Sequence, residues 1–259
     1  ILISTRAAQL IINVAKDLQD YLFTSMRVSV LVKRSEDLAN DALHAENVII
    51  LAAKQELTDC GAELSVPRSY RYICTEKRVI ICGCDERGVG QGSYYLEDLM
   101  NLREAPALKF CDVVREPLFS PRMVHSGFGL DQYPDQYLNA IAHAGMDAIL
   151  VFAKGVNETP AGFLDFNYLI HRAKNYGLDV YLYSYLKSEK HPDDPGAEEY
   201  YDSTYGALFK ACPEAKGVIL VGESCEFPSK DPNTTRKLRK DMPKDGLPST
   251  KPSPGWWPC

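Results

Sequence analysis

The sequence has no continuous run of 18 apolar residues, no Cys-x-x-Cys pair and no histidine-rich cluster. The first absence argues against a segment that spans a bilayer, and the other two argue against a zinc site. It also has no excess of positive charge, because 29 Lys and Arg stand against 35 Asp and Glu, for a formal net charge of -6. We therefore expect no nucleic-acid or membrane partner, no metal and no other cofactor.

The chain begins at Ile1 without an initiating methionine and without the basic and then apolar residues of a signal peptide, so we interpret it as a fragment. Its eight cysteines lie mostly in apolar surroundings, where a free thiol packs as a small hydrophobe. This favours a reducing compartment and a cytoplasmic protein. Secretion is the alternative, since Asn-x-Thr triplets at Asn157 and Asn233 match glycosylation acceptors.

Residues 1–112 predict a small α/β domain with a mixed sheet. Apolar residues at spacings of three and four indicate helices over 5–24 and about 89–102. The sequence further predicts four strands, at 27–32, 47–52, 69–74 and 78–82. A short polar turn joins the last two, which is typical of a hairpin.

From about residue 113 onward, strand and helix alternate four times. The predicted strands lie near 122–126, 148–152, 179–184 and 217–221, and the helices between them near 134–145, 162–176 and 197–212. This alternation is typical of a parallel sheet with right-handed crossovers. The pattern stops in the proline-rich segment 228–259, which we interpret as a functional or disordered loop.

A carboxylate directly follows the last predicted strand. The apolar run 217–221 is typical of a strand covered on both faces, and it leads into Gly222 and Glu223. In parallel α/β folds, the loops at the carboxyl ends of the strands carry the chemistry. We therefore favour Glu223 as a functional acid, with an ordinary structural glutamate as the alternative.

Gly88, Gly90 and Gly92 follow a predicted strand and raise the question of phosphate binding. They lack the Gly-x-Gly-x-x-Gly spacing and the acidic residue at the tip of the following strand that dinucleotide sites use. We do not expect a nucleotide site here.

Four segments carry a resemblance to a known group of enzymes: 87–96, Pro121-Arg122, 176–182 and 217–226. The first is similar to the glycine-containing turn and helix that precede the barrel in glycoside hydrolases with a hexosaminidase-type N-terminal domain. The second is similar to their first barrel strand, and the last two to the third and fourth strands of the α-glucuronidases. The chain thus resembles β-N-acetylhexosaminidases and α-glucuronidases.

The resemblance implies a hexosaminidase-like α/β domain at 1–112 and the N-terminal half of a (β/α)8 TIM barrel, with about four β/α units, at 113–259. A complete barrel needs about 250 residues. We therefore expect the second catalytic carboxylate to lie on a later strand and this piece alone to be inactive. Unpaired strand edges of a half barrel favour a homodimer or aggregation.

The resemblance also implies a glutamate after the fourth strand as general acid, for which Glu223 and Glu226 compete. Hexosaminidases place an adjacent Asp-Glu pair there, but this chain has Gly222 before Glu223, which puts their acetamido-assisted chemistry in doubt. Asp131 and Asp135 are weak candidates for the second carboxylate, since both suit the start of a helix.

Further residues are candidates for contact with a carbohydrate substrate: Arg122, His125, Asn157, Tyr183, Trp256 and Trp257. All of these except His125 have a structural alternative. Arg122 suits an ion pair near the barrel floor, Asn157 a solvated loop, and Tyr183 the edge of a core. The two tryptophans suit stacking on a sugar face, unless the tail is disordered.

We therefore predict a glycoside hydrolase that cleaves a carbohydrate by carboxylate acid/base chemistry. The alternative is a non-catalytic carbohydrate-binding or interaction module on a relic barrel. The sequence leaves open the sugar, the linkage and whether the enzyme retains or inverts configuration.

Overall fold

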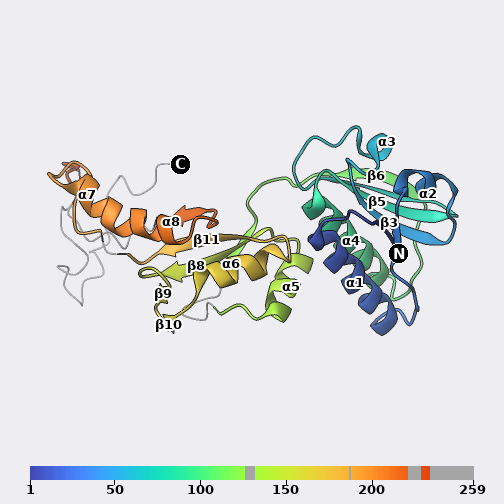
Figure 1. Cartoon of the computed structure of the whole chain (residues 1–259), viewed down its shortest axis with the longest axis horizontal. Helices are drawn as coiled ribbons and strands as arrows, with labels where there is room; N and C mark the ends of the chain where they lie inside the picture. The colour runs from blue at the N-terminus through green and yellow to red at the C-terminus, as the bar shows by residue number, and fades with distance from the viewer. Residues whose placement is uncertain (126–131, 187, 221–228, 234–259) are drawn as a thin grey trace. The chain divides into compact units, whose positions relative to one another are not determined.

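The computed structural model describes residues 1–125, 132–186, 188–220 and 229–233 (Figure 1). The chain divides into two compact units. Unit 1 contains Ile1–Val124, Tyr133–Ile149 and Ile170–Asp179, and unit 2 contains His125–Gln132, Leu150–Leu169 and Val180–Cys259. No helix within the described ranges is long and apolar enough to cross a membrane.

The first sheet has six strands in the order β2-β1-β3-β5-β4-β6. They are β1 Leu2–Ser4, β2 Lys33–Ser35, β3 Val48–Ala53, β4 Tyr70–Cys74, β5 Arg78–Gly83 and β6 Cys111–Arg115. β1 is parallel to β2 and β3, β3 is parallel to β5, and β4 is antiparallel to both β5 and β6. The predicted mixed sheet and its hairpin are therefore confirmed. The domain boundary at 112/113 stays a prediction, and β6 contains the residues on both sides of it.

The strand predicted at 27–32 is wrong, because the chain pairs with β1 only from Lys33 onward. The carbonyl groups of this segment are bound elsewhere. The carbonyl oxygen of Val30 accepts the side-chain amide of Gln19 (2.7 Å), and that of Leu31 accepts the amino terminus of Ile1 (2.7 Å). The alternation of valines thus follows half-buried positions along a connecting loop rather than a strand.

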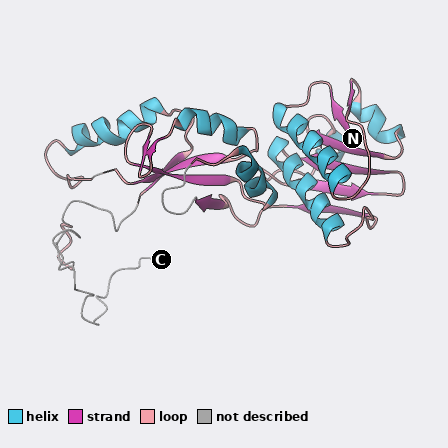
Figure 2. Ribbon diagram, turned by 90° about the horizontal axis from the view of Figure 1, so that it is seen from below, coloured by secondary structure: helices cyan, strands magenta, loops and turns pink. Residues whose placement is uncertain are grey.

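Helices cover both faces of this sheet. α1 Gln9–Thr24 and α4 Glu86–Asn101 lie side by side on one face (Figure 2). The short helices α2 Leu38–His44 and α3 Thr58–Gly61 belong to the other face, where Leu38 and Leu57 share a core with Ile50, Ile80 and Cys82. The central strands are therefore covered on both sides, which explains their nearly continuous apolar sequence.

The glycines of α4 allow the helix to approach the sheet closely. A Cβ atom at Gly88 would lie 2.3 Å from the backbone oxygen of Ser69, and one at Gly92 would lie 2.4 Å from Cγ2 of Ile81. At Gly90 the nearest atom would be 3.6 Å away, an ordinary contact. Helix–sheet packing thus accounts for Gly88 and Gly92.

The second sheet has the order β12-β11-β8-β7, which follows the order of its strands in the chain. The strands are β7 Met123–His125, β8 Ala148–Ala153, β11 Asp179–Ser184 and β12 Gly217–Ile219. β11 and β12 are parallel. β8 and β11 are parallel as well, because the amide of Asp179 donates to Asp147 at their start and that of Tyr185 to Ala153 at their end.

Helical segments connect these strands as predicted. They are α5 Asp135–His143, α6 Phe166–Lys174, and the continuous run of α7 Ala197–Tyr201, the π-helix Asp202–Gly206 and α8 Ala207–Ala211. A two-stranded antiparallel pair, β9 Glu158–Thr159 and β10 Gly162–Phe163, precedes α6. The chain is thus a mixed α/β protein with several sheets, and the partial barrel stays a prediction.

Three arginines and two aspartates form a network at the starts of β8 and β11. Arg87 donates two hydrogen bonds to Asp179, of 2.9 and 2.7 Å, and Arg68 reaches both Asp179 (3.3 Å) and Asp147 (3.7 Å). Arg122 binds Asp147 through Nε (3.2 Å). The Asp147 side chain is 2% exposed and that of Asp179 13%. We call these five residues the arginine–aspartate network.

We predict that Gly88→Ala destabilises the fold by about 2–3 kcal/mol, because the new methyl group meets a backbone oxygen that no change of rotamer moves. Gly90→Ala is the matched control in the same helix. It should be neutral or stabilising by up to about 1 kcal/mol, since alanine favours a helix and has room here. Urea unfolding of both variants measures the difference, and equal stabilities would contradict the packing argument.

We predict that Asp179→Asn lowers the free energy of unfolding by about 3–5 kcal/mol, because it leaves the partly buried charge of Arg87 without its ion-pair partner and Arg68 with only the longer contact to Asp147. The control is Asp112→Asn, which removes an ion pair with Arg71 on a half-exposed carboxylate and should cost less than about 1 kcal/mol. Thermal unfolding of the two variants side by side is the measurement. A cost at Asp179 as small as that at Asp112 would show that the network does not stabilise the fold.

Candidate active site

Four aromatic side chains meet where three strands of the second sheet end. His125 is the last residue of β7, Phe152 the penultimate residue of β8, Tyr183 lies near the end of β11 and Tyr185 just beyond it. The ring centroid of Phe152 lies 6.2 Å from that of His125, 5.0 Å from Tyr183 and 5.2 Å from Tyr185. All three contacts are edge-to-face. We call these four residues the aromatic face.

Alternation along β11 determines which side of the strand the tyrosines occupy. Leu182 and Ser184 are buried, and the Ser184 hydroxyl forms a hydrogen bond of 2.6 Å with the hydroxyl of Tyr205 in the π-helix. Successive residues of a strand point to opposite sides, so Tyr183 and Tyr185 lie on the other side, where both are half-buried. His125 is exposed and Phe152 is 6% exposed, so Phe152 supports a partly open surface.

This arrangement suits contact with a ligand that has both apolar and hydroxylated surfaces. Tyrosine offers an aromatic ring and a hydroxyl group, and the histidine ring offers nitrogen atoms that donate or accept. The carboxyl ends of parallel strands are also where α/β folds place their ligand sites. Two of the residues predicted to contact substrate, His125 and Tyr183, are brought together here.

Arg122 lies at the opposite end of β7, immediately before its first residue. Its Nε donates to Asp147 (3.2 Å), as does its backbone amide (2.7 Å). Arg122 thus forms an ion pair with an acid, which is the structural alternative that we gave for this residue from the sequence. Binding of a sugar hydroxyl by Arg122 stays a prediction.

Asn157 caps a helix in this structure. Its side-chain oxygen accepts the amide of Phe166, the first residue of α6 (3.0 Å), and its backbone adopts a positive φ of 56°. A contact between Asn157 and substrate stays a prediction. Asp135 begins α5 and binds Nε of Arg172 (2.8 Å), in line with the helix-start role that we favoured for it.

The remaining candidates fall outside the described residues: Asp131, Glu223, Glu226, Trp256 and Trp257. Their roles stay predictions. Within the described part of the chain, no group of three or more His, Cys, Asp or Glu side chains is placed to hold a metal ion. The six cysteines that the structure describes are all free thiols.

Sequence reasoning missed the arginine–aspartate network, although one signal for it was present. The sequence Gly-x-Asp precedes or begins two strands, as Gly145-Met146-Asp147 and Gly177-Leu178-Asp179. Both glycines adopt a positive φ at the end of a helix, 79° and 72°, and both aspartates contact Arg68. A glycine that ends a helix, followed by an aspartate at the start of a strand, occurs twice. This repeat indicates that the two aspartates share a basic partner, but it does not identify that partner.

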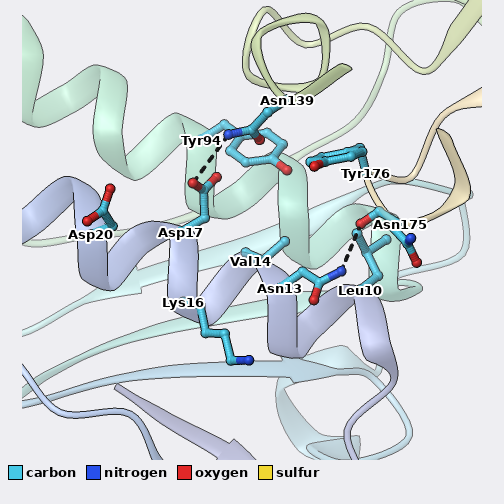
Figure 3. Close-up of a pocket in the computed structure, with 10 residues that line it drawn as sticks. All are labelled: Leu10, Asn13, Val14, Lys16, Asp17, Asp20, Tyr94, Asn139, Asn175 and Tyr176. Carbon is cyan, nitrogen blue, oxygen red and sulfur yellow. Dashed lines mark hydrogen bonds between the residues drawn. The ribbon is translucent and has the colours of Figure 1, made fainter. Parts of the chain in front are cut away.

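Unit 1 also contains a pocket of about 420 Å³, shown in Figure 3. α1 and α4 contribute Asn13 and Tyr94, α5 contributes Asn139, and Asn175 and Tyr176 follow α6. None of these residues stood out in the sequence, because they come from four separate segments and each is an ordinary polar residue of a helix or turn.

Beside this pocket, His143 lies between two carboxylates. Its Nε2 is 3.1 Å from Glu97 and 3.2 Å from Asp17, and its Nδ1 forms a hydrogen bond with the backbone oxygen of Asn139 (2.9 Å). Burial alone would lower the pKa of His143, but the bonds to Glu97 and Asn139 and the nearby carboxylates raise it. Burial raises the pKa of Glu97, whose Oε1 is buried without a partner among the described residues.

We predict that stability falls with rising pH because of His143. Its folded pKa is raised, so its contribution is complete below the unfolded pKa of about 6.5 and is lost as the pH rises through the folded value. Comparison of the wild type with His143→Gln isolates this contribution. The stability advantage of the wild type should be largest near pH 6 and shrink above it, by no more than about 1.4 kcal/mol per pH unit. His44→Gln, at an exposed site, is the control; a pH-independent advantage at His143 would refute this assignment.

No protein-family model and no curated protein matches this sequence. Solved structures do resemble the fold. A GH138 enzyme described as targeting pectin rhamnogalacturonan II matches with a TM-score of 0.57 at 12% identity, over 85% of this chain and 30% of that chain. The structure of CpGH84B matches with a TM-score of 0.55 at 16% identity, over 87% of this chain and 40% of that chain.

A mutant Streptomyces plicatus beta-hexosaminidase in complex with its product GlcNAc matches with a TM-score of 0.49 at 14% identity. The match covers 71% of this chain and 41% of that chain. The chain thus spans less than half the length of each of these structures. At such identities the likeness concerns the fold alone. The chain has a fold similar to part of glycoside hydrolases.

Proposed function

We propose that this chain is part of a glycoside hydrolase and that the aromatic face contacts the sugar. The observation that carries the proposal is the meeting of His125, Phe152, Tyr183 and Tyr185 at the carboxyl ends of three neighbouring strands. A sugar ring has apolar C–H surfaces and a rim of hydroxyl groups. Aromatic rings cover the former, and the tyrosine hydroxyls and imidazole nitrogens bind the latter.

The register of the second sheet supports Glu223 as the acid of this site. β12 pairs with β11 so that Ile219 lies opposite Tyr183. Glu223 follows Ile219 by four residues, a span of about 13 Å at most when fully extended. This short separation in sequence is the reason why we propose Glu223 as the acid for a sugar bound at the aromatic face. Glu226, three residues later, is the competing candidate.

In the proposed reaction the protonated carboxyl group of Glu223 donates its proton to the glycosidic oxygen as the bond from that oxygen to the anomeric carbon breaks. A second carboxylate acts as base or nucleophile on the anomeric carbon. Such an acid needs a raised pKa, and loss of solvation on substrate binding is the general means by which a carboxyl group acquires one. We propose that the second carboxylate lies on a later strand, which is supported by the match of this chain to only 30% and 40% of the two glycoside hydrolase structures.

The resemblance leaves two enzyme types open, the α-glucuronidases and the hexosaminidases, and the residue before Glu223 helps to choose between them. The residue before Glu223 is Gly222, so an aspartate that would hold a substrate acetamido group is missing at that position. This supports an α-glucuronidase-like reaction over an acetamido-assisted one. The partial (β/α)8 barrel belongs to the same proposal, supported by four strands whose order in the sheet follows their order in the chain.

We predict that Glu223→Gln lowers kcat on glycosides with a poor leaving group by about 10²–10⁴-fold in the polypeptide that carries this chain together with the later strands. The loss should be much smaller for an activated aryl glycoside, because a good leaving group needs little protonation. Glu226→Gln is the matched control and should retain most of the activity.

Full activity of Glu223→Gln on the poor leaving group would exclude Glu223 as the acid, and a selective loss in Glu226→Gln would assign that role to Glu226. Sugar binding measured by calorimetry separates the proposal from a non-catalytic module. The non-catalytic carbohydrate-binding module would be supported if a sugar binds with unchanged affinity after both glutamates are replaced and no form of the protein hydrolyses it.

A further inference from the structure

The pocket in unit 1 has two hydroxyl groups that form no hydrogen bond with any described residue. Tyr94 is only 6% exposed, yet no described residue forms a hydrogen bond with its hydroxyl group. Tyr176, half-buried at the other side of the pocket, likewise forms no side-chain hydrogen bond with any described residue. Figure 3 shows the two hydroxyl groups turned toward each other. Neither hydroxyl is a fully buried atom, so each is open to the pocket and free to bind water or a ligand there.

Both tyrosines are neutral hydroxyl groups at ordinary pH. Burial raises the pKa of Tyr94, and it also raises the pKa of Tyr176. Each therefore donates one hydrogen bond and accepts others. The Tyr94 ring packs against the ring of His143, with centroids 4.1 Å apart and planes tilted by 35°. This contact and its burial limit the orientations of the Tyr94 side chain.

The rest of the lining offers amides above an apolar floor. Asn13 donates to the backbone oxygen of Asn175 (3.3 Å) and Asn139 donates to Asp17 (3.3 Å), so these amides are held in fixed orientations. Leu10 and Val14, 8% and 2% exposed, form the apolar part. Amides, phenols and a small apolar floor suit a ligand with many hydroxyl groups and some C–H surface.

The charges around the pocket cancel. Asp17 is paired with His143 and bound by Asn139, so it does not present a free carboxylate. Lys16 and Asp20, both exposed, carry opposite charges, and Lys16 points away from the tyrosines in Figure 3. An ionic ligand would therefore find no uncompensated charge. A volume of about 420 Å³ lies within the range of about 300–1,000 Å³ for small-molecule sites.

We infer that this pocket binds a neutral sugar ring, with the hydroxyl groups of Tyr94 and Tyr176 and the amides of Asn139 and Asn175 as its hydrogen-bonding partners. The site is separate from the aromatic face and does not rest on the proposed hydrolase function. It gives the chain a second carbohydrate contact, in which no bond is broken.

NMR of the full chain labelled with ¹⁵N tests this inference by titration with neutral monosaccharides (glucose, galactose, mannose and xylose), with a uronate and with the linear polyol sorbitol. We expect at least one neutral ring sugar to shift the side-chain amide signals of Asn139 and Asn175 in a saturable manner. Their Asn→Ala variants assign these signals. Signals that do not move with any ring sugar, or that move equally with sorbitol or more strongly with the uronate, overturn the inference.

Tyr94→Phe is the decisive variant, because it removes the hydroxyl and keeps the ring. We expect it to raise the dissociation constant of the sugar about tenfold and to leave the midpoint of urea unfolding unchanged, since the hydroxyl has no protein partner to lose. The control is Tyr72→Phe, which removes the hydroxyl of a fully buried tyrosine of β4 that does not line the pocket. It should leave sugar binding unchanged. Equal affinities of Tyr94→Phe and the wild type would overturn the inference, because the Tyr94 hydroxyl would then not bind the sugar.

Discussion

The structure of unit 1 depends on two aspartates that are almost fully withdrawn from water. Asp147 is 2% exposed and Asp179 13%, and an isolated carboxylate at such positions would cost several kcal/mol of solvation. The charged hydrogen-bond donors of Arg68, Arg87 and Arg122 surround the two carboxylates and offset this loss of solvation. Arg68 is common to both aspartates, so loss of either acid leaves the same guanidinium short of a partner. Such coupling makes the network a single unit rather than a set of independent ion pairs.

The network also explains why several local features of the chain occur together. Asp85 begins α4 by accepting the amide of Gly88 (2.8 Å), and it accepts the amide of Arg68 (3.0 Å). One carboxylate thus positions both the helix that carries Arg87 and the loop that carries Arg68. Gly88 lies directly over Ser69, so a side chain there would push this helix away from the loop. Close packing thus explains Gly88 and Gly92, two of the three glycines that raised the question of a phosphate site.

Much of the fold could be predicted from the sequence, because local patterns of apolar and turn residues determine those strands and helices. The continuous apolar run at 48–53 and the alternating run at 179–184 both became strands, and the turn between β4 and β5 appeared where predicted. The run at 27–32 failed because its carbonyl groups bind Gln19 and the amino terminus, a tertiary effect that no local pattern contains.

The candidate site was only partly readable. His125 and Tyr183 were predicted because they lie at strand ends, whereas Phe152, at the centre of the aromatic face, is hidden in an apolar run that reads only as core. The partners of Asp179 lie 92 and 111 residues away in the chain, and the pocket of Tyr94 and Tyr176 combines segments about 80 residues apart, so no sequence spacing reveals either.

The most direct test of the account asks whether the aromatic face contacts a sugar. Fluorine NMR of the chain labelled with 3-fluorotyrosine resolves its tyrosines individually, with Tyr183 and Tyr185 assigned by their Tyr→Phe variants. We expect a panel of monosaccharides, including a uronic acid and an N-acetylhexosamine, to contain a sugar that shifts both signals saturably. Signals of Tyr183 and Tyr185 that stay fixed throughout the panel would contradict it, whatever happens at other tyrosines.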